Sequence, residues 1–102
     1  MASRQDDAAT FDGVGPVLEA GETAQAIIVA IRKLNANVIV VDRGSYVRVF
    51  ALGRCVVARK VVEEALGKPF VLPGDLELVM PSFKGTLTMT DEEVIWAWKS
   101  EP

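Results

Sequence analysis

Few side chains in this sequence could do chemistry, and none stands beside a group that would activate it. The chain has no histidine, so its serines lack the imidazole base that usually activates a hydroxyl near neutral pH. Cys55 is followed by Val56 and Val57, which indicates a small buried side chain rather than a reactive thiol. A single cysteine without histidine also excludes an internal disulfide and a zinc site built from those two ligands.

Adjacent acidic side chains are the remaining candidates for acid–base chemistry. They occur as the pairs Asp6–Asp7, Glu63–Glu64 and Glu92–Glu93. Neighbouring side chains diverge on a helix or a strand, so these pairs predict solvated faces. A di-iron site in a helical bundle needs Glu-x-x-His pairs, which a chain without histidine cannot supply. We therefore predict no catalytic, cofactor-binding or metal-binding residues, and we regard a stand-alone enzyme as the weakest class.

Size and charge indicate one small domain. The chain has 102 residues, half of them apolar, and a net charge of −3, which disfavours general binding to nucleic acid or anionic membranes. Residues 1–12 are polar and acidic and predict a flexible tail without the apolar core of a signal peptide; residues 13–102 form the predicted domain. No apolar run approaches the ~20 residues that span a bilayer. We expect a soluble, cytoplasmic protein that is monomeric when free.

Two helices are expected to organise the domain. Residues 22–34 predict the first, and residues 59–66 predict a second, shorter helix that ends at Gly67. Apolar residues of the first helix recur at steps of three and four: Ala24, Ile27, Ile31 and Leu34. The second helix is expected to bury Val62, Ala65 and Leu66.

Several strands complete the expected fold. Pro16 lacks an N–H, so residues 13–18 predict an edge strand, whereas the β-branched residues 38–41 predict a strand covered on both faces. Residues 46–52 predict a strand with Tyr46, Arg48 and Phe50 on one face and Val47, Val49 and Ala51 on the other.

The C-terminal half predicts further strands. A tight connection at Gly53 leads to a strand over residues 55–58, and residues 76–80 fit either a strand or a short helical turn. Residues 84–90 and a last strand with Val94, Trp96 and Trp98 facing the core predict a hairpin. The order β-α-β-β-β-α-β-β predicts an α+β fold, a single small domain of mostly antiparallel strands packed with two main helices.

One alternative function is an RRM-like module that binds single-stranded RNA. The order of the first elements fits, and Arg43-Gly44 followed by Phe50 resembles part of the RNP1 motif. Ser45 and Val47 stand where that motif has aromatic residues, which leaves Phe50 as the one stacking side chain.

A second alternative is docking on another protein through a strip of basic side chains. Five basic residues and no acidic one lie in this part of the chain: Arg43, Arg48, Arg54, Arg59 and Lys60. A strip of one sign could steer the chain to an acidic groove. Alternate residues of a strand face opposite ways, so the five cannot all point together, and each alone has a structural role as its simpler explanation.

A series of short motifs resembles a known family. In chain order the motifs are Val14-Gly15-Pro16, Ala20-Gly21, Asp42-Arg43, Tyr46-Val47-Arg48, Arg59-Lys60, Glu63-Glu64, Leu66-Gly67-Lys68-Pro69-Phe70 and Ser82-Phe83-Lys84-Gly85. The series resembles the small effector, or coupling, proteins of bacterial multicomponent soluble di-iron monooxygenases, particularly those serving toluene, phenol and alkene hydroxylases. It covers about residues 14–99 and is most specific over residues 42–70.

The resemblance implies a regulatory function without a reaction or cofactor of its own. Such proteins dock on the di-iron hydroxylase, change its active-site conformation, and tune oxygen activation, substrate access and the coupling of NADH use to hydroxylation or epoxidation. The hydroxylase carries the iron, and a reductase and often a ferredoxin carry electrons. The docking candidates are Val14, Gly15, Pro16, Arg43, Tyr46, Arg48, Arg59, Lys60, Ser82, Phe83 and Lys84. The first three would order against the partner as an added strand or a fixed arm.

Overall fold

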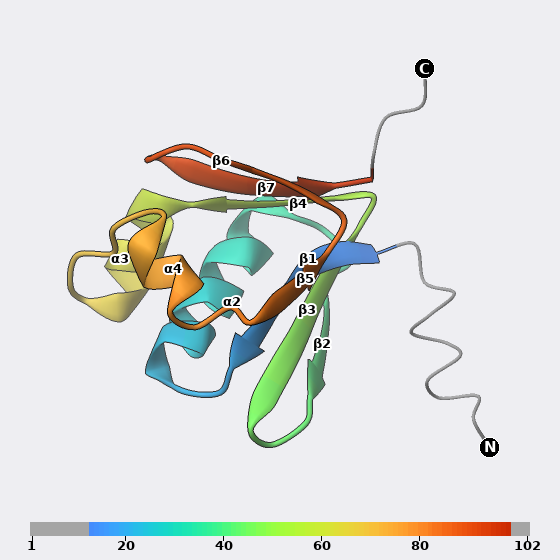
Figure 1. The fold of residues 1–102 in the computed structure, drawn as a ribbon, viewed down its shortest axis with the longest axis horizontal. Helices are drawn as coiled ribbons and strands as arrows, with labels where there is room; N and C mark the ends of the chain where they lie inside the picture. Colours follow the sequence, from blue (N-terminus) through green and yellow to red (C-terminus); the bar gives the residue numbers. More distant parts are fainter. Residues whose placement is uncertain (1–12, 99–102) are drawn as a thin grey trace.

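The computed structural model describes residues 13–98 and has two antiparallel sheets with helices packed beside them (Figure 1). The predicted tail, residues 1–12, lies outside the described residues, and the predicted domain begins at Gly13, the first of them. The elements in chain order are β1 (Gly13–Glu19), α2 (Glu22–Leu34), β2 (Ile39–Asp42), β3 (Tyr46–Leu52), β4 (Arg54–Ala58), α3 (Arg59–Leu66), α4 (Gly74–Glu77), β5 (Ser82–Lys84), β6 (Thr86–Met89) and β7 (Glu93–Ala97). The predicted α+β class with antiparallel strands is confirmed.

The first sheet has the strand order β2-β3-β1-β5, which places β1 in its interior. The edge-strand prediction for residues 13–18 is therefore wrong. Pro16 is tolerated because the ladder between β1 and β3 skips Gly15 and Pro16, where a missing N–H costs least. Both residues pair instead with β5, Gly15 opposite Lys84 and Pro16 opposite Phe83.

The second sheet has the strand order β4-β7-β6, and two of its strands directly follow strands of the first sheet in the chain. β3 continues into β4 through Gly53, and β5 continues into β6 through Gly85, with φ values of 72° and 106° that favour glycine. A Cβ on Gly85 would lie 2.8 Å from Cγ1 of Val14. The single strand predicted over residues 84–90 is thus two strands bent at Gly85, while the C-terminal hairpin of β6 and β7 is confirmed.

The helices begin and end where the sequence predicts. Asn35 ends α2: its Nδ2 donates to the carbonyls of Ile31 (2.7 Å) and Val56 (2.8 Å), and its Oδ1 accepts from the Val56 N–H (3.0 Å), which ties α2 to β4. Gly67 ends α3 with φ 79°. Leu34 is exposed, because the buried residues of α2 end at Ile31 and include Ile28 instead.

Three other local expectations need correction. In α3 only Val62 is buried, since the helix lies at the surface; Ala65 is exposed. The ambiguous residues 76–80 lie in and after the short helix α4, not in a strand. β2 is a half-buried edge strand rather than a covered one, because no strand pairs with its outer side.

The core lies between the two sheets and α2. Val14 and Leu18 of β1, together with Val47 and Val49 of β3, are buried there, and Figure 1 shows the helices on one side of β3. Trp96 is fully buried as expected, but Trp98 follows the end of β7 and is exposed. Cys55 is buried, and burial raises the pKa of its thiol to about 12, which confirms the predicted core role.

Candidate docking surface

The face of the first sheet that points away from the core carries four of the predicted docking side chains, those of Tyr46, Arg48, Ser82 and Lys84. Residues that pair directly across neighbouring strands share a face. Arg48 of β3 pairs with Val17 of β1 and with Val41 of β2, and Val17 pairs in turn with Ser82 of β5. We call this the outer face; its members include Val17, Glu19, Ile39, Val41, Tyr46, Arg48, Phe50, Leu52, Ser82 and Lys84.

A cluster of two cations and two aromatic rings lies at one end of the outer face. The guanidinium carbon of Arg48 is 5.4 Å from the centre of the Phe50 ring, and Nζ of Lys84 is 5.7 Å from the same ring. Lys84 is also 5.4 Å from the ring of Trp98. We call these four residues the cation–aromatic cluster. Its contacts have the geometry of cation–π interactions, which hold the charges above the sheet.

Phe50 explains how the cluster is supported. Its side chain is only 2% exposed, yet it lies outside the main hydrophobic core. The strand alternation that buries Val49 on the inner face places Phe50 on the outer one, where Arg48 and Lys84 lie over it. The Phe50 ring is therefore not free to stack on an RNA base, and the RRM alternative loses the one aromatic platform that its motif match offered.

Gly15 lets the strands beneath the cluster approach closely. A Cβ at this position would lie 2.1 Å from the backbone oxygen of Val49, and Gly15 has φ 151°. Its partner across β5 is Lys84. Glycine is thus needed here for backbone spacing and conformation, and this spacing fixes Arg48, Phe50 and Lys84 relative to one another.

The two cations of the cluster have no carboxylate partner within residues 13–98. Ion pairs in this part of the chain involve Arg59. Beside the cluster, Ile39 and Leu52 expose apolar side chains on the same face. Unpaired charge beside exposed apolar surface is typical of a surface that meets a partner.

A shallow hollow lies at the other end of the outer face, beside the turn into β3. The Ala20 N–H donates to the Ser45 carbonyl (2.9 Å), and the Glu19 N–H donates to the Val79 carbonyl (2.8 Å). These bonds join the end of β1 to the two segments that lie beside the hollow. Its lining residues are Val17, Glu19, Ala20, Ser45, Tyr46 and Pro81. Glu19 is exposed on this lining and carries a charge opposite to that of the cluster, while Arg43 is exposed at the adjoining turn.

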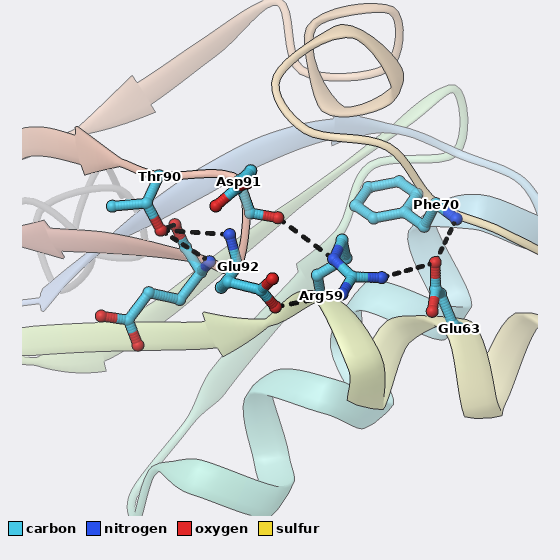
Figure 2. Close-up of polar contacts among 7 residues, drawn as sticks. Arg59, Glu63, Phe70, Thr90, Asp91 and Glu92 are labelled. Atoms are coloured by element: carbon cyan, nitrogen blue, oxygen red, sulfur yellow. Dashed lines mark hydrogen bonds and ion pairs between the residues drawn. The ribbon is translucent and has the colours of Figure 1, made fainter.

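Arg59 has a different environment, which we call the Arg59 corner (Figure 2). Its Nη1 is 2.9 Å from Oε2 of Glu63, its Nη2 is 3.0 Å from Oε1 of Glu92, and its Nε donates to the Asp91 carbonyl at 3.1 Å. Oε2 of Glu63 also accepts from the Phe70 N–H at 2.9 Å. The corner joins the β6–β7 turn to α3 and to the loop that follows it.

These contacts shift two pKa values. The Phe70 N–H, followed by the Arg59 guanidinium, lowers the pKa of the Glu63 carboxyl below its ordinary value. Hydrogen bonds to Glu92 and then Glu63 raise the pKa of Arg59. Both shifts favour the charged forms. The charges of the Arg59 corner are therefore already paired with one another inside the chain.

The structure therefore divides the predicted docking residues. Arg43 is exposed at the β2–β3 turn, and Arg59 and Lys60 begin α3 beyond β4, so the basic strip does not form one patch. Phe83 pairs with Pro16 on the opposite face from Lys84. The candidates that share the outer face are Tyr46, Arg48, Ser82 and Lys84.

The prediction that residues 14–16 take up an added strand needs correction. Val14, Gly15 and Pro16 are buried, and β1 already has a partner strand on each side, so it cannot take up an added strand. Phe50 and Trp98 were missed as members of this surface's cation–aromatic cluster. The signal for Phe50 was its alternation with Arg48, whereas Trp98 could be recognised only once the end of β7 was known.

Within residues 13–98, no group of three or more histidine, cysteine or acidic side chains is arranged to hold a metal ion. In the same residues, no helix has both the length and the apolar character needed to cross a bilayer.

Comparisons with known proteins agree with the resemblance found in the sequence. Residues 12–97 match the MmoB/DmpM family. The chain is 43% identical over 89 residues to the effector subunit of an alkene monooxygenase system from Xanthobacter autotrophicus strain Py2, covering 85% of this chain and 87% of that protein.

Solved structures show the same fold. A chain from a phenol hydroxylase–regulatory protein complex superposes with a TM-score of 0.73 at 20% identity, covering 85% of this chain and 98% of that one. A chain from a second such complex gives 0.71 at 22% identity, covering 84% and 99%. With the family match over most of its length, the chain belongs to the MmoB/DmpM family and is a regulatory, non-catalytic component.

Proposed function

We propose that this protein is the effector component of a soluble di-iron monooxygenase system. It binds the hydroxylase, which carries the di-iron centre, and modulates active-site conformation, oxygen activation, substrate access and the coupling of NADH use to hydroxylation or epoxidation. A reductase, often with a ferredoxin, supplies electrons to the same system. The observation that carries the proposal is the 43% identity to an alkene monooxygenase effector subunit over nearly the whole chain.

The chain has no histidine and a single cysteine, which is buried, and this composition suits the role. An effector changes a partner's conformation only when it binds two partner states with different affinity. Moving a two-state equilibrium from 1:99 to 99:1 needs about 5.5 kcal/mol of differential binding free energy. A rigid surface with satisfied internal contacts can supply such a difference because little of the binding energy is lost in ordering the effector itself.

Reconstitution tests the proposal. The chain is titrated into its hydroxylase with the matching electron-transfer proteins, and substrate turnover, product formed per NADH and product regiochemistry are measured. We expect turnover and product per NADH to rise and then saturate. An unrelated acidic protein of similar size is the control. If none of the three quantities changes across the hydroxylases of candidate systems, the proposal is wrong.

A further inference from the structure

We propose that the cation–aromatic cluster is the main hydroxylase contact, and that the hydroxylase presents carboxylates within an apolar surface to it. This inference rests on the proposed function and adds the location and chemistry of the contact. The helices lie on the core side of β3 (Figure 1), and the cluster contains Arg48 and Lys84, two cations without an ion pair among the described residues. The cluster therefore suits an acidic surface of the hydroxylase rather than a second copy of this chain.

The two cations are arranged so that an acidic partner would be favoured. Both lie within 6 Å of the centre of the same Phe50 ring, so they place two positive charges on the same part of the outer face. A carboxylate that reaches both gains two charge-assisted hydrogen bonds. Neither cation must first break an ion pair with the described residues, so little of the gain is offset.

The apolar surroundings strengthen the same interaction. Leu52, Ile39 and the ring of Trp98 are exposed around the cluster, and burial of such surface excludes water from the charged contacts. Lys84 lies over Trp98 as well as Phe50, so the ammonium is held in place before the partner arrives. Held side chains lose less rotamer freedom on binding than free ones do.

The hollow at the far end of the outer face would fix the orientation in which the hydroxylase binds. Glu19 on its lining is exposed and forms no ion pair with the described residues. A basic or hydroxyl side chain of the hydroxylase fits there when its carboxylates meet Arg48 and Lys84. Opposite charges at the two ends allow one orientation and disfavour the reverse, because reversal brings like charges together.

Charge-reversal variants test the location of the contact. We expect Arg48→Glu to raise the dissociation constant for the hydroxylase about 10- to 100-fold, and Lys84→Glu to do the same. The matched control is Lys60→Glu, which makes the same charge change on α3 and should alter affinity less than about threefold. Circular dichroism and thermal unfolding establish that each variant is folded. The neutral variants Arg48→Gln and Lys84→Gln, expected to weaken binding about 5- to 10-fold, serve if a reversal unfolds the protein.

The outcomes separate this inference from the proposed function. If the wild-type protein stimulates its hydroxylase while Arg48→Glu and Lys84→Glu bind normally, the contact proposed here is wrong and the function stands. If the wild-type protein neither binds nor stimulates, the function itself is wrong. A wild-type dimer in solution that Arg48→Glu dissociates would assign the outer face to a second copy and overturn the inference.

Carbodiimide cross-linking tests the partner chemistry directly. This reagent joins an amine to a carboxylate only where the two are in contact. We expect peptides in which Lys84 is joined to an aspartate or glutamate of the hydroxylase. Cross-links to the hydroxylase that occur through Lys60 or Lys68 and not through Lys84 would contradict the proposal. For the orientation, we expect Glu19→Gln to weaken binding about 3- to 10-fold; unchanged affinity would remove the hollow from the contact.

Discussion

Arg48 and Arg59 come from the same basic stretch of sequence, but their surroundings in the fold are opposite. Arg59 is held by two carboxylates and a backbone carbonyl in the Arg59 corner. Arg48 lies over an aromatic ring near another cation, Lys84, with no carboxylate at ion-pair distance among residues 13–98. Among the described residues, carboxylates balance the charge of Arg59 and none balances that of Arg48.

This difference teaches which basic residues are available to a partner. A cation that already has internal ion pairs must give them up before it can bind another carboxylate, so the net gain is small. A cation without such pairs gains the whole interaction. The number of basic residues in a stretch of sequence is therefore a poor guide to a docking site, whereas unbalanced charge in the fold is a good one.

The largest expected effect comes from Gly15, which supports the cation–aromatic cluster but not the Arg59 corner. Gly15→Ala should lower the free energy of unfolding by about 3–5 kcal/mol, because the new Cβ would meet the Val49 carbonyl, a backbone atom that cannot turn aside. Urea unfolding measures the change. Docking should weaken as well, since β1 and β3 must move apart beneath Phe50.

Gly44→Ala is the matched control for that substitution. Gly44 also has a positive φ, 88°, but nothing lies within 4 Å of the position of its Cβ. Conformational strain alone should cost about 1 kcal/mol. Equal losses for the two variants would show that the close approach of β1 and β3 contributes nothing.

Ionic strength separates the two regions next. We expect the dissociation constant for the hydroxylase to rise about tenfold between 50 and 250 mM salt, because the cluster meets its partner through charges. In the variant with both Arg48→Gln and Lys84→Gln this dependence should largely disappear. Titrations at several salt concentrations give the slope. A slope as steep in the double variant as in the wild type would place the salt-sensitive contact elsewhere, for example at Lys60.

Neutralising each arginine in turn gives a smaller and more direct test. Arg59→Gln should lower the thermal stability of the protein and leave hydroxylase affinity unchanged, because the Arg59 corner joins α3 to the β6–β7 turn. Arg48→Gln should weaken hydroxylase binding and leave the thermal stability unchanged. Thermal unfolding and a binding titration on both variants decide the matter. Loss of affinity in Arg59→Gln at unchanged stability would mean that the corner also docks.

The sequence predicts local structure well in this protein because the determinants are local. The bounds of α2 and α3 and the alternation of β3 follow from apolar spacing, Gly67 and the β-branched residues. The position of β1 within its sheet does not follow, because it depends on pairing with β5, a segment far along the chain. Pro16 suggested an edge, and the gap in the β1–β3 ladder that accommodates it is a tertiary feature.

The candidate docking surface is only partly predictable for the same reason. The alternation of Tyr46, Arg48 and Phe50 was correctly expected from the period of a strand. The presence of Lys84 beside Arg48 requires the register of both β3 and β5 on β1. Similarly, no spacing rule joins Arg59 to Glu92, because the β6–β7 turn must first fold back onto α3.

The smallest expected effect is a pH dependence that belongs to the Arg59 corner alone. The pKa of Glu63 is lowered in the folded state, chiefly by the Phe70 N–H and then by Arg59, so the unfolded chain binds a proton more readily. The stability from this carboxylate is therefore fully present above the ordinary glutamate pKa of 4.5 and is lost as the pH falls through the lower folded value. Glu63→Gln keeps an acceptor for the Phe70 N–H and removes the charge.

Wild type should consequently be more stable than Glu63→Gln at pH 7, and the difference should shrink as the pH falls below 4.5. Urea unfolding between pH 7 and the acid limit measures it. Glu64→Gln is the control on the same helix, since Glu64 is exposed and has no hydrogen bond or ion pair with the described residues. A constant difference across this range would mean that Glu63 stabilises the corner by packing rather than by charge. In that case the Arg59 corner would not differ from the cation–aromatic cluster by having its charges paired within the described residues.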